Sequence, residues 1–520
     1  MHGYLEPCGC TSRPLGGVDK LAARLRKVAR DGVPQVLVGA GDLLFGEKHG
    51  AEGGAAAGRP LDQELWKAET LVDVLSRLHM RAATPGDLDV AYGAQTFASL
   101  ARASRFPWLA AGDRIAGASL RETVVERVGG VRVGIFGVSE LEAPDGSLPA
   151  GVTRGARAVA AAERAARALR EQEVDVVVAL VHGSRRTARR VAAAAPEIDF
   201  VVEGGLAQAN VSPPSSAGRA ILLQAGREGH GVLVVDVFLG DVDPDERASW
   251  TDASEWTRSA ERTRVEQRIA DLRARIAEWE RDPGVDRASL AGQRTRLRAM
   301  EQEQRALTRR VRLGSGPTIV ARWEPLEEDA PEDPEIGALM DRYDRRVNDH
   351  NRRIFADLAP PPALPGRATY EGAEECGTCH EEAFTWWRGH EHGKAYATLV
   401  ERHKEFNLSC VGCHVTGYNQ PSGSTVTHNE GLVDVGCESC HGPGSLHAAA
   451  PRQRGLIARV VPENTCVGCH NSEHSDLFDY PSYRADLMKP GHGRPMPDGR
   501  LVAGQRPEDF PDAGTGTRSR

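Results

Sequence analysis

Apolar residues in the first 240 positions fall into short runs separated by longer amphipathic stretches. The runs are rich in valine, isoleucine and leucine, which is typical of buried β-strands. Residues 155–172 are rich in alanine, arginine and leucine and predict a helix. Strands that alternate with helices predict an α/β layered domain over residues 1–245. The strand-like runs lie at residues 35–42, 131–140, 174–183, 198–205 and 231–239.

A second pattern, in which apolar residues are spaced alternately by four and three, runs through residues 255–312. This spacing is the seam of a coiled coil. Asp282, Pro283 and Gly284 interrupt it and predict a turn. We therefore expect an α-helical antiparallel coiled-coil hairpin whose charged faces are solvated. The seam residues are Val265, Ile269, Leu272, Ile276 and Trp279 before the turn, and Leu290, Leu297, Met300, Leu307 and Val311 after it.

The rest of the chain divides at a proline-rich stretch. Residues 313–369 hold one strand-like run (TIVARW), an acidic stretch, a helical stretch and the linker LAPPPALPG. Proline-rich composition of this kind marks a domain boundary. Residues 370–495 then form a separate domain, for which we expect mostly helical and irregular structure. Residues 503–520 are rich in glycine, proline and charge, which predicts a disordered tail.

Composition excludes some classes of function. The chain has 520 residues, 40% of them hydrophobic and 27% charged, and a formal net charge of −8. This acidic balance gives no reason to expect nucleic-acid binding. No apolar run approaches the roughly 20 residues that span a bilayer, and the chain does not open on a secretion signal. Eight of the ten cysteines lie between Cys376 and Cys469, and eleven of the seventeen histidines lie at or beyond His380.

Four copies of Cys-x-x-Cys-His account for these cysteines. Two cysteines at this spacing can each form a thioether with one vinyl group of a haem, and the adjacent histidine can ligate the iron. Zinc bound by four cysteines is the alternative, but it does not require a histidine after every pair. We therefore expect four covalent c-type haems. The thioether cysteines would be Cys376, Cys379, Cys410, Cys413, Cys437, Cys440, Cys466 and Cys469, and the proximal iron ligands His380, His414, His441 and His470.

The domain also has too few clustered aliphatic residues between positions 371 and 495 to build a conventional core. Four haems would supply the missing apolar interior, so the domain should fold only with its cofactors attached. Each iron has a second axial position, and the sequence alone does not choose its ligand. The spare histidines are His390, His392, His403, His428, His447, His474 and His492.

Residues 370–495 resemble the tetrahaem cytochromes that accept electrons from hydroxylamine oxidoreductase, the cytochrome c-554-like family, and related multihaem cytochromes. The most specific segments are WWRGHEHGKAYATL, GCESCHGPGSLH and GHG. The resemblance implies that His392, His447 and His492 are distal ligands and that one of the four irons is five-coordinate. His403 and His474 are reserve distal ligands if all four irons are six-coordinate. Bis-histidine ligation suits outer-sphere electron transfer, whereas a five-coordinate iron leaves one position for a small ligand.

The first 240 residues resemble the calcineurin-like metallophosphoesterase domain of periplasmic 5′-nucleotidases. The resemblance rests on HG at 2–3, GDLLFG, TPGDLDVAYG, LVHG and EGGLAQA, and it implies an α-β-β-α sandwich with a two-metal site. It implies metal-ligand positions at His2, Asp42, Asp87 and His182. Departures from the family pattern are Leu88, Gly205 and Ala207, which stand where that family has histidines.

These departures predict that a two-metal site cannot be completed. We therefore expect a vestigial cleft in which Asp42, Asp87, Asp89 and His182 are satisfied polar groups. A single divalent metal held by His2, Asp42 and His182, with help from Cys8 or Cys10, is left open. The two cysteines could equally form a strained disulfide or remain thiols.

Three functions follow from these patterns. The first is an electron-transfer protein with four haems, unidentified redox partner proteins and a phosphoesterase-like scaffold or docking module. The second is a metal-dependent phosphoesterase or nucleotidase with a haem appendage. The third is a haem oxidoreductase acting on a small nitrogen or sulfur compound. Haem attachment predicts a bacterial periplasm or cell surface, and the opening MHG predicts that a strand, an aspartate and an export signal or surface anchor lie upstream of Met1.

Overall fold

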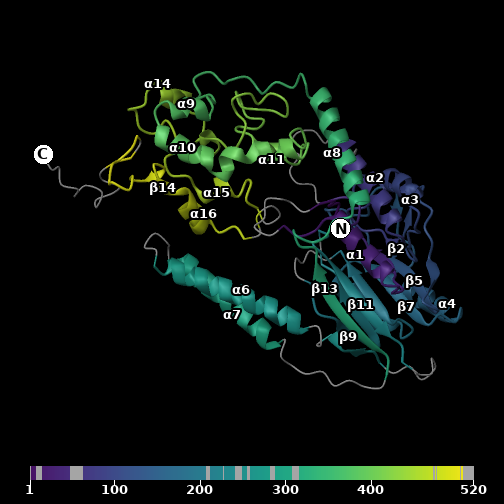
Figure 1. The fold of residues 1–520 in the computed structure, drawn as a ribbon. Helices are drawn as coiled ribbons and strands as arrows, with labels where there is room; N and C mark the ends of the chain where they lie inside the picture. The colour runs from purple at the N-terminus through teal and green to yellow at the C-terminus, as the bar shows by residue number, and fades with distance from the viewer. Residues whose placement is uncertain are drawn as a thin grey trace. The chain divides into compact units, whose positions relative to one another are not determined.

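The structure is a computed structural model of the chain, drawn in Figure 1. It divides into two compact units. The first comprises residues 1–9, 13–273 and 296–340, and the second comprises residues 10–12, 274–295 and 341–520. The structure describes residues 2–6, 14–46, 62–205, 211–226, 228–240, 249–254, 258–281, 287–306, 316–471, 475, 477–503 and 505–506.

A six-stranded sheet forms the centre of the first unit. Its strand order is β4-β5-β7-β8-β10-β9. The inner strands β5, β7, β8 and β10 run parallel, while β4 and β9 pair antiparallel at the edges. Parallel strands are covered on both faces, which explains the nearly unbroken apolar runs in the sequence. The strands are β4 (Thr123–Val128), β5 (Val131–Ser139), β7 (Val176–His182), β8 (Phe200–Gly204), β9 (Ser215–Ala217) and β10 (Ala220–Gln224).

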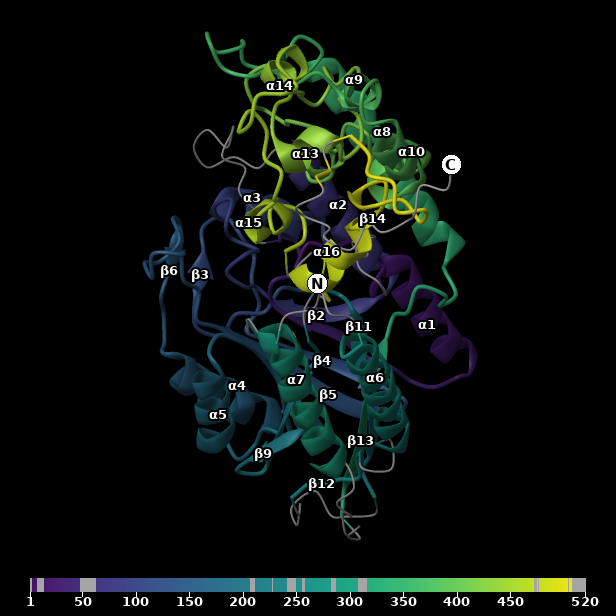
Figure 2. The same ribbon diagram turned by 90° about the vertical axis from the view of Figure 1, so that its left-hand side faces the viewer.

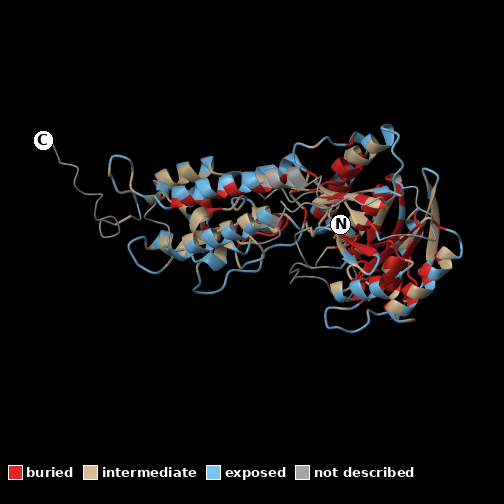
Figure 3. Cartoon of the chain, turned by 90° about the horizontal axis from the view of Figure 1, so that it is seen from below, coloured by how far each residue is buried: buried red, intermediate tan, exposed pale blue. Residues whose placement is uncertain are grey.

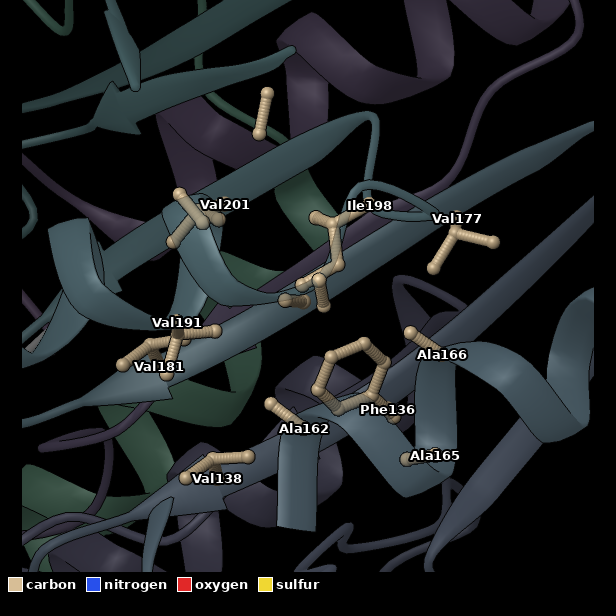
Figure 4. Close-up of a cluster of buried hydrophobic side chains, with 14 of the residues drawn as sticks. Phe136, Val138, Ala162, Ala165, Ala166, Val177, Val181, Val191, Ile198 and Val201 are labelled. Carbon is tan, nitrogen blue, oxygen red and sulfur yellow. The ribbon is translucent and has the colours of Figure 1, made fainter. Parts of the chain in front are cut away.

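Two helices, α4 (Ala158–Arg170) and α5 (Arg185–Ala194), cover one face of this sheet. Alanines on one side of α4 allow the helix to approach the strands closely, and Phe136 fills the space between them, as Figure 4 shows. Every side chain in this cluster is less than one tenth exposed. Burial of apolar area on this scale is the main stabilising contribution to such a layer.

The opposite face of the sheet packs against further strands. Strand β1 (Leu37–Ala40) pairs in parallel with β2 (Met80–Thr84), and Ala40 and Ala82 pack against Leu180 of β7. A three-stranded sheet, in the order β11-β13-β12, buries Ile319 against Val176 and Phe200. Helix α2 (Asp62–Arg77) packs against β2 and α3 (Ala94–Ala103). The three strands are β11 (Gly231–Phe238), β12 (Thr251–Asp252) and β13 (Thr318–Pro325).

The predicted α/β class of the first unit is confirmed. All five strand-like runs contain a strand, namely β1, β5, β7, β8 and β11, the predicted helix is α4, and TIVARW lies within β13. The pattern did not indicate β2, β4 or β10. Figure 2 shows the strands of this unit from a second direction. Its other elements are α1 (Val18–Arg30), β3 (Arg114–Ile115) and β6 (Val152–Thr153).

Two long helices, α6 (Arg258–Trp279) and α7 (Arg287–Ala306), occupy the predicted hairpin, and they lie side by side in Figures 1 and 2. Three contacts show that they run in opposite directions. Glu266 bonds to Gln304, Arg273 to Glu301 at 2.6 Å, and Glu280 to Arg294 at 2.5 Å. The five seam residues of α6 are buried. Leu307, Val311 and the Asp282-Pro283-Gly284 turn lie outside the described residues.

The second unit contains short helices joined by irregular segments, and Figure 3 shows that few of its residues are buried. Helix α8 (Pro334–Ile354) begins in the first unit and continues into the second. Within the second unit its Asn351 side chain donates to the Phe406 carbonyl, and the Asn348 side chain accepts from the Phe406 N–H. The other helices are α9 (Ala373–Gly377), α10 (Glu381–Gly389), the 3₁₀ helix η3 (Glu391–Lys394), α11 (Ala395–Glu401), α12 (Val411–His414), α13 (Cys437–His441), α14 (Ser445–Ala449), α15 (Glu463–Cys466) and α16 (Tyr480–Leu487), with strands β14 (Lys489–Pro490) and β15 (Gly493–Arg494).

Candidate functional site

Three residues predicted as metal ligands meet in the first unit at the carboxyl ends of its strands. Asp42 follows β1, Asp87 lies in the turn after β2, and His182 is the last residue of β7. The His182 Nε2 atom lies 3.2 Å from Asp87 Oδ2, and its Nδ1 atom lies 3.9 Å from Asp42 Oδ2. Parallel strands bring their carboxyl ends to one edge, where α/β folds place their ligands.

The His182 ring is completely buried between the two carboxylates. Burial alone lowers the pKa of His182, but the negative charges of Asp42 and Asp87 outweigh it and raise the pKa to about 9. The two carboxylates therefore favour protonation of the ring. In the structure Nε2 accepts the Asp87 N–H at 3.1 Å, and the ring fills the space between the two carboxylates.

Asp89 is held in the same cluster by backbone donors. Its Oδ1 atom accepts the N–H groups of Leu43 and Leu44 at 2.9 and 2.8 Å, and its Oδ2 atom accepts the Gly86 N–H at 2.8 Å. Burial, followed by the nearby Asp42 charge, raises the pKa of Asp89 to about 6. Asp89 therefore links the turn after β2 to the loop after β1, and both of its carboxylate oxygens have hydrogen-bond donors.

Glycines make room for the buried imidazole. A Cβ atom at Gly41 would lie 2.5 Å from His182 Nδ1, and one at Gly205 would lie 2.7 Å from His182 Cε1. Both glycines also have positive φ angles, 92° and 75°, which other residues rarely adopt. The imidazole thus fills the space beside Gly205, one of the positions where the phosphoesterase pattern has a histidine.

These residues do not fit a two-metal site. Within the described ranges, no three His, Cys, Asp or Glu side chains are grouped so that they could hold a metal ion. Asp42 Oδ1 accepts the Leu88 N–H at 2.9 Å, and its Oδ2 faces His182. His2 contributes its backbone N–H, 2.6 Å from the Asp42 carbonyl. Cys8, Cys10 and Ala207 lie outside the described residues, so their predicted roles stay predictions.

In the second unit, each Cys-x-x-Cys-His motif lies in or directly after a short helix. His414 ends α12 and His441 ends α13, while His380 and His470 follow α9 and α15. The eight cysteines are free thiols in this structure and stand for the sulfur atoms that would form thioethers. Seven of them are half-buried and Cys379 is exposed, so all can be reached by a haem.

Hydrogen bonds at Nδ1 orient several of these histidines. The Nδ1 atoms of His414 and His441 each lie 2.6 Å from a backbone carbonyl, those of Ala395 and Ala458. His492 makes the same bond to the Leu487 carbonyl at 2.7 Å. A carbonyl only accepts, so Nδ1 carries the proton and the Nε2 lone pair is available for a metal. This is the tautomer that iron ligation requires.

Three of the four proximal histidines face a histidine predicted as distal. The ring centroids are 6.2 Å apart for His380 and His447, and 6.3 Å apart for His441 and His492. They are 6.0 Å apart for His392 and His470. A ligating nitrogen lies about 2 Å from a transition metal. Two imidazoles on opposite sides of one iron therefore have centres roughly 6 Å apart, and the three pairs fit haem iron.

Burial favours the ligating form of two of these histidines. Burial, with smaller contributions from His390 and His470, lowers the pKa of His392 to about 4. Burial also lowers the pKa of His492. Neutral imidazole is the form that binds a metal.

The remaining spare histidines have other surroundings. His390 Nδ1 accepts the His392 N–H at 3.2 Å, which caps η3. His403 lies just after α11 with a positive φ of 56°, and His428 Nδ1 lies 3.2 Å from the Thr427 hydroxyl. His474 lies outside the described residues. None of these observations tests the assignment of His403 and His474 as reserve ligands.

The apolar surface of the second unit also fits bound haems. Its one buried apolar cluster among the described residues surrounds the second motif and contains Val411, Val415 and Val426. Leu446 after the third motif and Val460 before the fourth are 40% and 73% exposed, and Val467 inside the fourth is 42% exposed. Large apolar side chains are normally covered, and porphyrin faces are suited to cover these.

Aromatic side chains near the histidines were not among the predicted site residues. The Trp386 ring stacks on His492 with centroids 4.6 Å apart and an angle of 4°, and Phe478 stacks on His470 at 5.2 Å. Tyr483 meets the His470 ring edge-on. The adjacent Trp386 and Trp387 could have indicated the contact with His492, because tryptophan side chains are usually highly buried.

Comparisons with known proteins agree with the chemistry of the second unit. Residues 375–442 match the family model described as "Cytochrome c554 and c-prime". Cytochrome c-554 of Nitrosomonas europaea is 33% identical over 114 residues, which are 19% of this chain and 48% of that protein. The chain thus spans about half the length of this curated relative.

The solved structures that resemble the chain share little sequence with it. A 5′-nucleotidase precursor from Thermus thermophilus is 15% identical, with a TM-score of 0.44, over 86% of this chain and 72% of that one. The sulfate thiohydrolase SoxB from the same genus is 14% identical, with a TM-score of 0.41, over 65% and 48%. Within the described residues no helix is long and apolar enough to cross a membrane. Residues 375–442 are a cytochrome c554-like domain.

Proposed function

We propose that this protein is an exported electron-transfer protein with four covalent c-type haems in residues 370–495. The observation that carries the proposal is the set of three histidine pairs, with ring centroids 6.0–6.3 Å apart, beside Cys-x-x-Cys-His motifs. Bound haems would supply reversible one-electron chemistry. The chain would hold them, choose their axial ligands and shield them from water.

The ligand assignment follows from these pairs. We propose that His447 is the distal partner of His380, that His492 is the partner of His441, and that His392 is the partner of His470. The three distal histidines of the family pattern are thereby used, which assigns the five-coordinate iron to the motif of His414. His403 and His474 stay reserve ligands. Each motif's two cysteines would form the thioethers.

We further propose that the phosphoesterase-like unit is a scaffold or docking module for redox partner proteins rather than a hydrolase. The support is the buried ring of His182, which lies between Asp42 and Asp87. The same proposal places the protein in a periplasm or at a cell surface. It also includes domain boundaries at residues 245, 255, 312 and 370 and coiled-coil packing of α6 on α7. Export follows from the chemistry of covalent haem attachment.

Mass spectrometry and redox titration test this function. The chain, exported in a host that attaches c-type haems, should gain the mass of four haems and show reversible reduction of its haem absorption bands. Replacing both cysteines of one motif with serine should remove one haem and leave the other three. A protein that binds zinc through these cysteines, or haems that cannot be reversibly reduced, would contradict the proposal.

A small-ligand reaction at the iron of the second motif is the third function that the sequence allows. It requires that the reduced protein binds carbon monoxide or nitric oxide at one iron of four. Absorption spectroscopy with each gas gives the number of irons that bind. Absence of binding would leave electron transfer alone.

A further inference from the structure

Glu438 is a buried carboxylate inside the third haem motif. It occupies the first variable position of Cys-Glu-Ser-Cys-His, on α13, and only 2% of its surface is exposed. A buried carboxylate is costly unless hydrogen bonds satisfy it. The variable positions of the other three motifs carry only glycine, threonine or valine, so the charge is particular to this motif.

Backbone donors from two separate segments satisfy this carboxylate. The Gly372 N–H donates to Oε2 at 2.8 Å, and the Glu371 N–H lies 3.0 and 3.1 Å from the two oxygens. The Gly444 N–H donates to Oε1 at 2.7 Å. Glu371 and Gly372 precede the first haem motif, and Gly444 follows the third. Glu438 therefore joins the chain around two different motifs.

Glycines allow both approaches. Gly372 has a φ of 90°, and a Cβ there would lie 2.5 Å from the Gly431 carbonyl oxygen. A Cβ at Gly444 would lie 3.1 Å from Glu438 Oε1. The Gly-Pro-Gly sequence after the motif thus turns the chain so that an N–H group points at the carboxylate.

A neutral contact joins the same two segments. The Thr369 N–H donates to the Ser445 hydroxyl at 2.8 Å, and the Ser445 N–H donates to the Thr369 carbonyl at 3.1 Å. Ser445 begins α14, which carries His447 opposite His380. Cys376 on α9 and Cys437 on α13, which stand for thioether sulfurs of the first and third motifs, lie close enough to shift each other's pKa in opposite directions.

We propose that Glu438 is a positioning residue that holds the first and third haem segments together and that its negative charge lowers the reduction potential of those two haems. The proposal rests on the function proposed above. A fixed negative charge favours the oxidised iron, which carries one more positive charge than the reduced iron. The same side chain fixes the distance between the segments that supply His380 and His447. A glutamate with a purely structural role would fix this distance without changing the reduction potentials.

Redox titration of variants tests the proposal, with the haems distinguished by their spectra. Glu438→Gln keeps the shape but removes the charge. It should favour reduction of the first and third haems by roughly tenfold, which is about 59 mV for one electron, and leave the second and fourth unchanged. Glu438→Asp keeps the charge and should restore values near those of the unmodified chain.

Two variants are matched controls. Ser445→Ala removes the neutral bond between the same segments, and Glu463→Gln removes an exposed charge beside the fourth motif. Neither should reproduce the selective shift. If Glu438→Gln has the potentials of the unmodified chain, or shifts all four haems equally, the proposal is overturned.

If the Glu438→Gln variant incorporates haem poorly, the number of haems attached at each motif still tests the proposal. Peptide mass spectrometry should then show haem loss at the first and third motifs, whereas equal loss at all four would overturn the proposal. The proposed function fails separately, because it requires covalent haem in the unmodified chain. An unmodified chain with four haems and unaltered variants would reject only the role of Glu438.

Discussion

The histidine pairs are the residue-scale feature on which the haem assignment depends. Each pair joins a proximal histidine, fixed by its motif, to a second histidine from a distant part of the chain. The proximal histidines could be predicted from the sequence, because each one ends a Cys-x-x-Cys-His motif. The pairing could not be predicted from the residues alone, because the sequence does not distinguish the seven spare histidines and only the fold brings particular rings close together.

Removing one distal ring tests a pair directly. His447→Ala should leave the first haem iron with one axial histidine, because the ring 6.2 Å from His380 is lost. The ferric protein should then gain one high-spin iron by electron paramagnetic resonance, in addition to the one assigned to the second motif.

His428→Ala is the matched control, because His428 is half-buried in the same unit and was assigned no iron. It should leave the spectrum of the unmodified chain unchanged. A high-spin signal that appears with His428→Ala, or fails to appear with His447→Ala, would contradict the pairing.

The raised pKa of the buried His182 ring predicts a dependence of stability on pH. The pKa of His182 is raised in the folded state to about 9, so its charge stabilises the fold most fully below the ordinary value of 6.5. This contribution is lost as the pH rises through about 9. The melting temperature of the first unit should therefore fall between pH 7 and pH 9.5, measured by differential scanning calorimetry.

His182→Gln identifies the source of this decline. The variant should be less stable at pH 7 and should show a smaller fall towards pH 9.5, because no proton is released from that site. His230, which is half-buried, is the control, and its change to Gln should keep the full decline. A decline of unchanged size in His182→Gln would locate the titrating group elsewhere.

At the scale of elements, helix α8 shows how a sequence pattern can identify an element and not its partners. The stretch 313–369 was expected to be a connecting segment. Its helix instead packs Asn348 and Asn351 against the segment before the second haem motif, and both side chains are less than one tenth exposed. Buried asparagines that bond to backbone groups specify one docking geometry.

Loss of one asparagine should weaken this docking. Asn351→Ala leaves the Phe406 carbonyl without its side-chain donor, which should cost about 1–3 kcal/mol of unfolding free energy. Chemical unfolding of the haem-loaded protein, followed by haem absorption, measures this change. Arg352→Ala, on the exposed side of α8, should change it by less than about 0.5 kcal/mol. Equal losses in both variants would contradict this role of Asn351.

Strands β5, β7 and β8 were predictable from their mostly apolar runs, whereas β10 (AILLQ), which is buried throughout, was not predicted. Strand β2 (MRAAT) and the edge strand β4 (TVVERV) were not predicted, since their mixed composition satisfies no single period. The short haem-domain helices follow no period either. Their geometry depends on cysteine chemistry and on glycine turns, which local propensity does not describe.

At the scale of the whole molecule, the two units differ in how they are stabilised. The first has a large apolar core between sheets and helices, whereas the described part of the second has one small apolar cluster. Covalent haems would complete the interior of the second. Removal of cofactor should therefore affect the two units very differently.

The departures Leu88 and Gly205 from the phosphoesterase pattern, with the His182 ring between Asp42 and Asp87, lead us to expect no phosphoesterase activity from the intact protein. With Mn²⁺ or Zn²⁺ added, hydrolysis of nucleotides or an aryl phosphate should not exceed the metal-free blank. The reason is that the His182 ring occupies the space between Asp42 and Asp87. Colorimetric release of phosphate or phenol provides the measurement.

Hydrolysis above the blank would support the hydrolase hypothesis only if it depended on Asp42. Turnover that disappears in Asp42→Asn but persists in Asp145→Asn, an exposed position in the same unit, would restore the hydrolase hypothesis. Turnover that persists in both variants would indicate a contaminating enzyme.

The contact between α9 and α13, which brings Cys376 near Cys437, has a consequence for assembly. Two neighbouring thiols can be oxidised to a disulfide by a dithiol oxidant, and a disulfide has no thiol left for a vinyl group. In an oxidising compartment, a disulfide between the first and third motifs would therefore compete with thioether formation at both motifs. Maturation would have to keep this pair reduced until its haems are attached. The order of cofactor attachment would thus depend on two sulfur atoms that lie sixty-one positions apart in the chain.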